Sequence, residues 1–334
     1  MKNLIRFLFL SFTLVFMGFA GTARYMSYPD IGHGKIVFSY DDDLWIVSEN
    51  GGLATRLTSY PGTETSPKIS PDGKWIAFNG NYHGVNAVYV IPVEGGMPRR
   101  ITYDWGRTRV IGWTPDSKKV IVRSDFELFT GWESKAYTVD LNGGYPEALP
   151  LPRAILLSFS PDGNRIAYND RGREEYYWHR YKGGQYTRIW IADLSKRSYK
   201  LITKYVGKNA YPMWIGHRIY FMSDRWEGIR NLFSIDPDHP EDVKRHTSFK
   251  SDIAYLSSGD GKIVFVEKGE IWIFDPSTEN LKKIDVKVAD DYWRLTPKTI
   301  NPKKYIHYVG IDNKGENFLL EARGDIFLVS RKSG

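Results

Sequence analysis

The segment from Ser66 to Thr102, SPKISPDGKWIAFNGNYHGVNAVYVIPVEGGMPRRIT, constrains the fold most, because its order of turns and apolar runs returns along the chain. Pro71-Asp72-Gly73 is typical of a tight hairpin: proline presets the first turn position, aspartate bonds back to the backbone, and glycine accepts a left-handed conformation. A second turn is indicated at Gly95-Gly96. The segment therefore predicts four short antiparallel strands. They are expected at Lys68–Ser70, Trp75–Asn79, Ala87–Pro92 and Arg99–Thr102.

Five further stretches carry a related order of turns and strands. They are residues 29–58, 109–149, 157–203, 211–247 and 254–286. A repeat of about 40 residues with four strands is typical of a β-propeller, because a single four-stranded sheet cannot bury both of its faces. The sequence thus predicts an all-β fold, a six-bladed β-propeller of four-stranded antiparallel blades over residues 28–288. A β-sandwich is the alternative, but sandwiches do not repeat turn, strand and double glycine in this order.

The first unit contains enough apolar segments for four strands of its own. These are expected at Tyr28–Ile31, Lys35–Tyr40, Leu44–Ser48 and Thr55–Thr58. A strand borrowed from the far end of the ring is then not required. We therefore expect the first and sixth blades to meet by packing alone, with Ile284–Lys287 remaining in the sixth.

The run Asp41-Asp42-Asp43 invites a calcium reading. Three adjacent carboxylates in a hairpin turn cannot all converge on one ion, so a solvated turn is favoured. The sequence therefore predicts no metal site and no cofactor.

The repeat lapses after Val288, where residues 289–304 contain two prolines and are typical of a linker. The pattern then restarts with three apolar segments. These are Tyr305–Ile311, Asn317–Glu321 and Asp325–Ser330. Residues 305–334 are therefore predicted to form a partial extra blade, the truncated start of a second propeller.

The composition excludes several classes of protein. A chain of 334 residues with 42% hydrophobic content can bury a large core, which excludes general disorder. The net charge of +7 does not indicate a nucleic-acid-binding surface, because lysine and arginine are spread among aspartate and glutamate. The chain has no cysteine, so disulfides, thiolate metal sites and a lipid-anchor cysteine are excluded.

The N-terminus has the pattern of a secretory leader. Lys2 and Arg6 precede the apolar run Phe7–Ala20, and small residues continue to Ala23. Residues 1–23 are therefore predicted to be a signal peptide, and the protein to be exported to the periplasm or beyond the cell. The apolar run is short for a bilayer span, so an uncleaved anchor is the alternative. No other segment is predicted to cross a membrane.

Two arginines, Arg107 and Arg109, stand at alternate positions just before the first strand of the third unit. The innermost strands of a propeller line its central channel. Guanidinium groups at that place could form paired hydrogen bonds with a carboxylate that enters the channel. Salt bridges between blades are the alternative reading.

The fourth unit carries an insertion, Arg171–Thr187, where most units have only a hairpin. Long loops of this kind usually carry function or contacts. Its aromatic residues could stack on peptide or sugar, or pack against a neighbouring blade. They are Tyr176, Tyr177, Trp178, Tyr181 and Tyr186. His179 and His217 have no second ligand at metal spacing and are interpreted as structural hydrogen-bonding residues.

Catalytic motifs are missing: the sequence has no G-x-S-x-G elbow, no HExxH, no cysteine nucleophile, no phosphate loop and no dinucleotide fingerprint. No catalytic residue is therefore predicted. The residues alone indicate an exported propeller that binds, gates or scaffolds another molecule.

Several segments resemble the N-terminal region of tricorn proteases. They are YPDIGHGKIVFSYDDDLWIVS, RTRVIGWTPDSKKVIVRS, EEYYWHRYKGGQYTRIWIADL, GHRIYFMSD and RHTSFKSDIAYLSSGDGKIVFVEKGEIWIFDP. In that family a six-bladed propeller precedes a seven-bladed one, a PDZ domain, and regions with a serine nucleophile and a histidine base. The assembled family protein is a hexamer that trims oligopeptides.

The resemblance covers the first propeller and the opening of the second, so the catalytic positions of the family have no counterpart here. It implies a substrate-gating, peptide-binding part of a tricorn-like serine protease, inactive alone, with oligopeptides and the missing protease domains as partners. Paired arginines of the family hold the C-terminal carboxylate of the substrate. Arg107 and Arg109 match them best, although they are spaced R-x-R and are not adjacent. Many family members are cytoplasmic, which is the alternative location.

A non-enzymatic periplasmic protein-binding propeller of the Tol type is the alternative function. Such proteins normally place an α/β domain between leader and propeller, whereas here the first repeat begins soon after Ala23. A prolyl-oligopeptidase-like enzyme would need a hydrolase domain that this sequence lacks.

Overall fold

The computed structural model describes residues 21–82, 84–103, 106–129, 133–171, 180–289, 297 and 299–333. Apart from a short 3-10 turn, the described elements are strands, and the all-β propeller fold is confirmed. Two compact units are distinguished, Met1–Ala289 and Asp290–Gly334. In the part of the chain that the structure describes, no helix is long and apolar enough to span a lipid bilayer.

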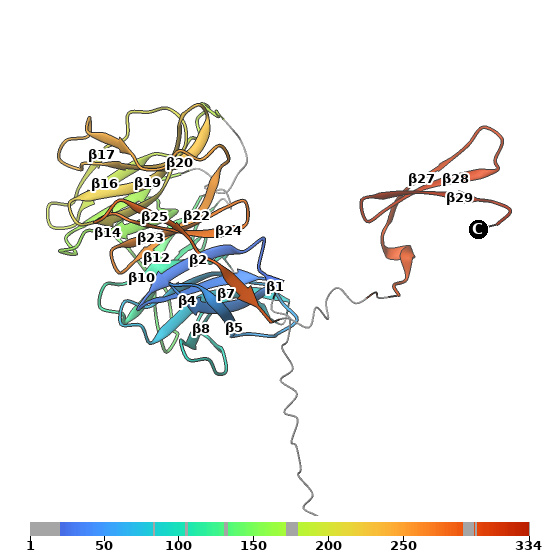
Figure 1. Ribbon diagram of the computed structural model, residues 1–334, viewed down its shortest axis with the longest axis horizontal. Helices are drawn as coiled ribbons and strands as arrows, with labels where there is room; N and C mark the ends of the chain where they lie inside the picture. Colours follow the sequence, from blue (N-terminus) through green and yellow to red (C-terminus); the bar gives the residue numbers. More distant parts are fainter. Residues whose placement is uncertain are drawn as a thin grey trace, which may run out of the picture. The chain divides into compact units, whose positions relative to one another are not determined.

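The first unit contains six antiparallel blades, each with four strands that follow one another in the chain (Figure 1). The first two blades are β2 (Ser27–Gly32), β3 (Lys35–Tyr40), β4 (Asp43–Ser48) and β5 (Gly52–Arg56), then β6 (Glu64–Ile69), β7 (Trp75–Tyr82), β8 (Val85–Pro92) and β9 (Arg99–Arg100). The third and fourth are β10 (Arg109–Trp113), β11 (Lys119–Ser124), β12 (Lys135–Asp140) and β13 (Glu147–Ala148), then β14 (Leu156–Phe159), β15 (Arg165–Asn169), β16 (Ile189–Asp193) and β17 (Ser198–Leu201). The last two are β18 (Asn209–Ile215), β19 (Arg218–Trp226), β20 (Ile229–Ile235) and β21 (Val243–Arg245), then β22 (Ile253–Gly259), β23 (Lys262–Glu267), β24 (Glu270–Asp275) and β25 (Asn280–Lys283).

The hydrophobic core lies between the blades. Among the described residues, six buried clusters are found, one at each interface between neighbouring blades. Residues of neighbouring blades that share a cluster are, from the first-to-second interface round to the sixth-to-first, Val37 and Phe78, Val88 and Trp113, Ile121 and Tyr168, Ile191 and Phe221, Met222 and Phe265, and Val264 and Phe38. Each blade is covered on both faces, so its central strands are apolar at consecutive positions, as at Ile76–Phe78. Burying one such side chain contributes about 1.5–3 kcal/mol.

A threonine after the last strand of most blades hydrogen-bonds to the strand that precedes the last one. Its hydroxyl accepts a hydrogen bond from a backbone N–H at 2.8–3.0 Å, where the strand ladder would otherwise leave the donor buried and unpaired. The pairs are Thr58 with Leu44, Thr102 with Val88, Thr203 with Ile189 and Thr247 with Leu232. These threonines are buried, and they explain why units end in RLT, RIT, LIT and RHT.

The prediction that the first and sixth blades exchange no strand is wrong. After β25, strand β26 (Val286–Val288) leaves the sixth blade and pairs in parallel with β5 of the first. Strand β1 (Gly21–Thr22) then pairs antiparallel with β26, so the first sheet has six strands. The four strands expected in the first unit are present, but its outer strand offered an open edge that β26 covers. Ile284, Val286 and Val288 are buried in the cluster between the two blades.

The interpretation of Asp41-Asp42-Asp43 as a solvated turn is wrong for Asp43. Asp41 and Asp42 form the exposed turn, but Asp43 begins β4 and is fully buried. Arg56, across the ladder on β5, forms an ion pair with its carboxylate. Strand alternation turns Asp43 inward, which the run of like residues concealed.

The insertion is described only at its ends, and Tyr176, Tyr177, Trp178 and His179 lie outside the described residues. Arg180 donates to the carbonyl of Glu227 at 3.2 Å, in the fifth blade. Thr187 accepts a hydrogen bond from the backbone N–H of Asn209 at 2.8 Å. The described ends of the insertion therefore contact the fifth blade. His217 is exposed in the turn between β18 and β19.

The second unit contains a turn, η2 (Pro302–Lys304), and a three-stranded antiparallel sheet. The strands are β27 (Ile306–Ile311), β28 (Asn317–Ala322) and β29 (Asp325–Ser330). Within a residue or two these bounds match the predicted segments. Most of the linker predicted at 289–304 lies outside the described residues.

Candidate functional site in the central channel

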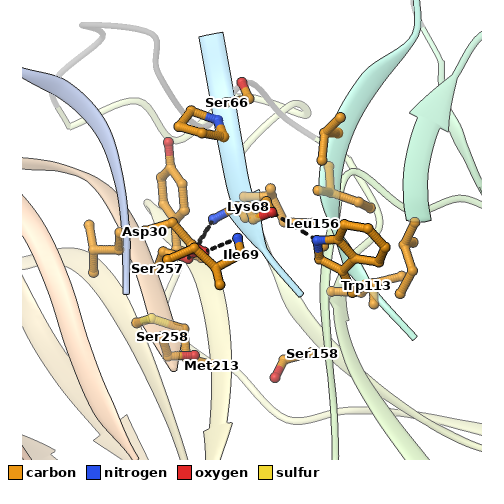
Figure 2. A pocket seen from close by; sticks show the side chains of 18 of the residues that line it. Asp30, Ser66, Lys68, Ile69, Trp113, Leu156, Ser158, Met213, Ser257 and Ser258 are labelled. Atoms are coloured by element: carbon orange, nitrogen blue, oxygen red, sulfur yellow. Dashed lines mark hydrogen bonds and ion pairs between the residues drawn. The ribbon is translucent and has the colours of Figure 1, made fainter. Parts of the chain in front are cut away.

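The first strands of the six blades, β2, β6, β10, β14, β18 and β22, surround a central cavity of about 240 Å³. Figure 2 shows side chains from several blades converging on it. Its wall combines apolar side chains with a few polar ones, the composition usual for small-molecule and peptide sites. This cavity is the candidate functional site.

A β-bulge recurs in these inner strands and brings its side chains to the cavity. The strand register shifts in five of the six, the exception being β14. In four of them a non-glycine residue has a left-handed backbone, which costs L-residues about 1–2 kcal/mol. They are Tyr28, Ser66, Tyr211 and Tyr255, with φ between 50 and 57°. Proline follows three of the four, and because it has no N–H, the interrupted ladder loses no donor there.

Arg109 begins β10 and lines the cavity. Its Nε donates to the Ser66 hydroxyl at 2.8 Å, and its guanidinium lies 5.0 Å from the centre of the Tyr28 ring. The Tyr28 ring in turn lies 4.3 Å from that of Tyr255. Residues of the first, second and sixth blades therefore hold this cation of the third blade at the cavity wall.

Arg107 does not line the cavity. Its backbone N–H and its Nε donate to Asp125 at 2.5 and 2.8 Å, and its side chain is 74% exposed. Burial alone would raise the pKa of Asp125, but the hydrogen bonds from Arg107 outweigh burial and hold the pKa below its usual value. The two predicted arginines thus lie in different surroundings, and Arg109 alone of the pair faces the candidate site.

A polar cluster in the cavity wall joins three blades: Asp30, Lys68 and Ser257 (Figure 2). One carboxylate oxygen of Asp30 accepts from Lys68 Nζ at 3.2 Å and from the Ser257 hydroxyl, which also contacts Lys68 Nζ. The other oxygen accepts from the backbone N–H of Ile69 at 2.7 Å. The side chain of Asp30 is 5% exposed and that of Lys68 is 19% exposed, so solvent screens this pair weakly.

The repeat explains where these residues stand. The first strand of each blade ends in a turn. The residues that stand three positions before this turn are equivalent in the six units, and all of them line the cavity. These residues are Asp30, Lys68, Gly112, Ser158, Met213 and Ser257. This set of residues was not predicted from the sequence, although an alignment of the units on their turns shows two opposite charges, Asp30 and Lys68, at equivalent positions of neighbouring units.

No group of three or more histidine, aspartate or glutamate side chains placed to hold a metal ion is found within the described ranges. The cavity wall itself carries two cations, Lys68 and Arg109, and one carboxylate, Asp30. The arrangement therefore suits an anionic ligand.

Fold and site together define a six-bladed β-propeller with a central cavity whose wall carries a net positive charge. Residues 23–280 match the family described as the tricorn protease N-terminal beta propeller domain. The chain therefore belongs to that family, as its motifs indicated.

A tricorn protease homolog of Saccharolobus solfataricus is 34% identical over 310 residues, which is 91% of this chain and 28% of that protein. A protein named as a tricorn-like protease N-terminal subunit, from Sulfurisphaera tokodaii, is 34% identical over 165 residues, 48% of this chain and 82% of its own length. The solved structure of the tricorn protease superposes with a TM-score of 0.75 at 28% identity, covering 92% of this chain and 30% of that one. The chain thus spans less than a third of the full-length relatives that it matches.

Proposed function

We propose that this chain is the peptide-binding propeller of a tricorn-like serine protease, and that its central cavity holds the C-terminal carboxylate of an oligopeptide. The observation that supports this most directly is the position of Arg109. Its guanidinium lines the cavity and is held there by Ser66 and the Tyr28 ring. Membership of the tricorn protease propeller family supports a peptide as the class of ligand.

The chemistry of a guanidinium group favours a peptide's C-terminal carboxylate as the ligand of Arg109. A carboxylate accepts two parallel hydrogen bonds from a planar guanidinium, which gives orientation as well as energy. One hydrogen bond to a charged group contributes about 1.5–3 kcal/mol. Because Ser66 and Tyr28 already orient Arg109, little side-chain entropy is lost when the peptide binds.

Peptide cleavage is placed in parts of the tricorn-type protein outside this sequence. The sequence contains no recognisable nucleophile motif, and it spans 28% of its Saccharolobus relative. In this proposal the chain works with tricorn-type protease domains, in an assembly such as the hexamer of the family, and delivers or retains their oligopeptides.

Export remains part of the proposal, because Lys2, Arg6 and the apolar run Phe7–Ala20 have the order of a secretory leader. Gly21–Thr22 pair with β26, and Ala23 is buried. A cut before Gly21 would therefore preserve the strand pairing between the first and sixth blades better than a cut after Ala23. N-terminal sequencing of protein secreted from its own leader tests this. A soluble cytoplasmic product that starts at Met1 would contradict export.

Calorimetric titration of the chain tests the proposed ligand. Tetrapeptides with a free C-terminal carboxylate should bind at least about tenfold more tightly than the same peptides with a C-terminal amide, a difference of about 1.4 kcal/mol. Equal affinity for the two forms, or no binding of either, would refute the carboxylate anchor.

A further inference from the structure

Lys68 is the second cation of the cavity wall, and the mechanism proposed above does not use it. Among the described lining residues, Lys68 and Arg109 are the basic side chains and Asp30 is the acidic one. Lys68 lies on β6 and Arg109 on the neighbouring β10, so the two come from adjacent blades.

The cluster around Lys68 presents a donor to the cavity, because most acceptor sites of the Asp30 carboxylate are already occupied. Asp30 accepts three hydrogen bonds, from Lys68, from the Ser257 hydroxyl and from the backbone N–H of Ile69. A carboxylate offers about four lone-pair sites, whereas an ammonium has three N–H donors. The contacts with Asp30 and Ser257 use two of those donors, which leaves Lys68 able to bind one further acceptor.

The same level of the cavity has room for a ligand group. Gly112 stands on β10 at the position equivalent to Lys68, and a Cβ built on it would meet no atom within 4 Å. Ser158 and Met213 complete this side of the wall (Figure 2). The Ser158 hydroxyl accepts from the backbone N–H of Trp214 at 2.9 Å. An open space therefore exists at the level of the ammonium.

The separation of the two cations sets what can bridge them. Arg109 precedes Gly112, the residue level with Lys68, by three positions, but the β-bulge between them leaves their partners on β11, Arg123 and Ile121, two positions apart, which is about 7 Å along the strand. One or two residues of extended peptide, at about 3.3–3.6 Å each, together with an acidic side chain, cover that span.

We propose that Lys68 forms a second anion subsite, which takes the carboxylate of an aspartate or glutamate side chain next to the C-terminus of the bound peptide. The inference rests on the proposed function, because Arg109 is taken to hold the terminal carboxylate. Lys68 then determines specificity: the ring prefers peptides with an acidic residue close to their C-terminus.

The contributions of the two subsites to peptide affinity are distinguished with four peptides. They are acetyl-Ala-Ala-Glu-Ala and acetyl-Ala-Ala-Gln-Ala, each as free acid and as amide. The Glu peptides should bind about tenfold more tightly than the Gln peptides to the unaltered chain, whichever C-terminal group they carry. The ratio of free acid to amide reports on Arg109, and the ratio of Glu to Gln reports on Lys68.

The variant Lys68→Gln with Asp30→Asn removes both charges of the pair and leaves polar side chains that can still hydrogen-bond to each other. It should bind Glu and Gln peptides equally and keep the preference for free acid over amide. Gly112→Leu is the second variant, since it fills the space and leaves the charges in place, and it should also abolish the Glu preference. Melting curves verify that each variant is folded.

Equal binding of Glu and Gln peptides by the unaltered chain would overturn the Lys68 subsite while leaving the carboxylate anchor standing. A Glu preference that persists in the double variant would also overturn it. A Glu preference without any preference for free acid would support Lys68 and refute the anchor at Arg109.

Discussion

Val288 lies opposite Ala54 in a parallel strand pair, so the end of the six-bladed unit is joined to the outer strand of its first blade. The neighbouring register pairs are Val286 with Gly52 and Lys287 with Leu53. On the inside of the same seam, Ser257 of the sixth blade hydrogen-bonds Asp30 of the first. The ring is therefore closed by hydrogen bonds at its rim and at its channel, in addition to hydrophobic packing.

A disulfide across this seam should stabilise the ring. Leu53 and Lys287 are exposed register partners, and neighbouring strands lie about 4.8 Å apart, a spacing that a disulfide can bridge. The chain has no other cysteine to mispair. Oxidised Leu53→Cys with Lys287→Cys should gain about 2–4 kcal/mol, because the bond closes a loop that contains almost the whole ring. The gain is measured as the difference in Tm with and without reductant.

The single variant Leu53→Cys is the control and should show no effect of reductant. Failure of the double variant to form the bond, or an unchanged Tm when it has formed, would contradict the strand exchange.

Removing one of the buried threonine hydroxyls should lower the free energy of unfolding by more than the small size of the group suggests. Thr102→Val leaves the buried N–H of Val88 without its acceptor, which costs about 1–3 kcal/mol. Thr102→Ser keeps the acceptor and should lose less. Urea unfolding of both variants gives the comparison, and equal losses would show that packing of the methyl group matters and the hydrogen bond does not.

The strands and the six-fold repeat were predictable because each unit encodes them locally, in Pro-Asp or glycine-containing turns and in consecutive apolar residues. The closing strand was not, because Val286–Val288 has the same local pattern in either blade. Its partner is decided by the open edge of β5 and by the cluster around Ile284, which are non-local properties. Asp43 was misjudged for a related reason: the burial of a carboxylate depends on Arg56, which lies on the next strand.

Glu64 should make the stability of the ring depend on pH. It is fully buried at the start of β6, and desolvation raises its pKa to about 8, with the nearby Tyr82 hydroxyl opposing the rise and the nearby Asp43 carboxylate adding to it. The ordinary value is 4.5. Between these values the folded protein keeps a proton that the unfolded chain releases, so stability is greatest below about 4.5 and falls as pH rises towards 8.

Glu64→Gln removes this proton uptake and still offers an amide oxygen to the Thr58 hydroxyl, which donates to the native carboxylate at 3.1 Å. The Tm of the unaltered chain should therefore fall relative to that of the variant between pH 5 and pH 8. Substitution of the exposed Glu94 by glutamine is the control and should leave the pH profile unchanged. A constant difference in Tm between the unaltered chain and Glu64→Gln would contradict the buried, protonated carboxyl.

The sequence identified one basic residue of the cavity and missed the other. Arg109 was predictable from its place at the start of an inner strand. Arg107 has the same sequence argument, but its backbone N–H and side chain both bind Asp125, a tertiary contact that spacing does not reveal. Lys68 was overlooked because it stands beside the conspicuous turn at Pro71, and its meaning appears only when Asp30 and Ser257 are brought beside it by the closed ring.

The comparison of Arg109→Gln with Arg107→Gln is the most direct test of whether Arg109 holds the C-terminal carboxylate of a peptide. The two residues have the same chemistry and alternate positions, but only Arg109 of the two lines the cavity. We expect Arg109→Gln to remove the roughly tenfold preference for free-acid over amidated tetrapeptides, and Arg107→Gln to retain it. Calorimetric Kd values for both peptide forms, measured on the two variants and the unaltered chain, decide the matter. An intact preference in Arg109→Gln, or its loss in Arg107→Gln, would contradict the account.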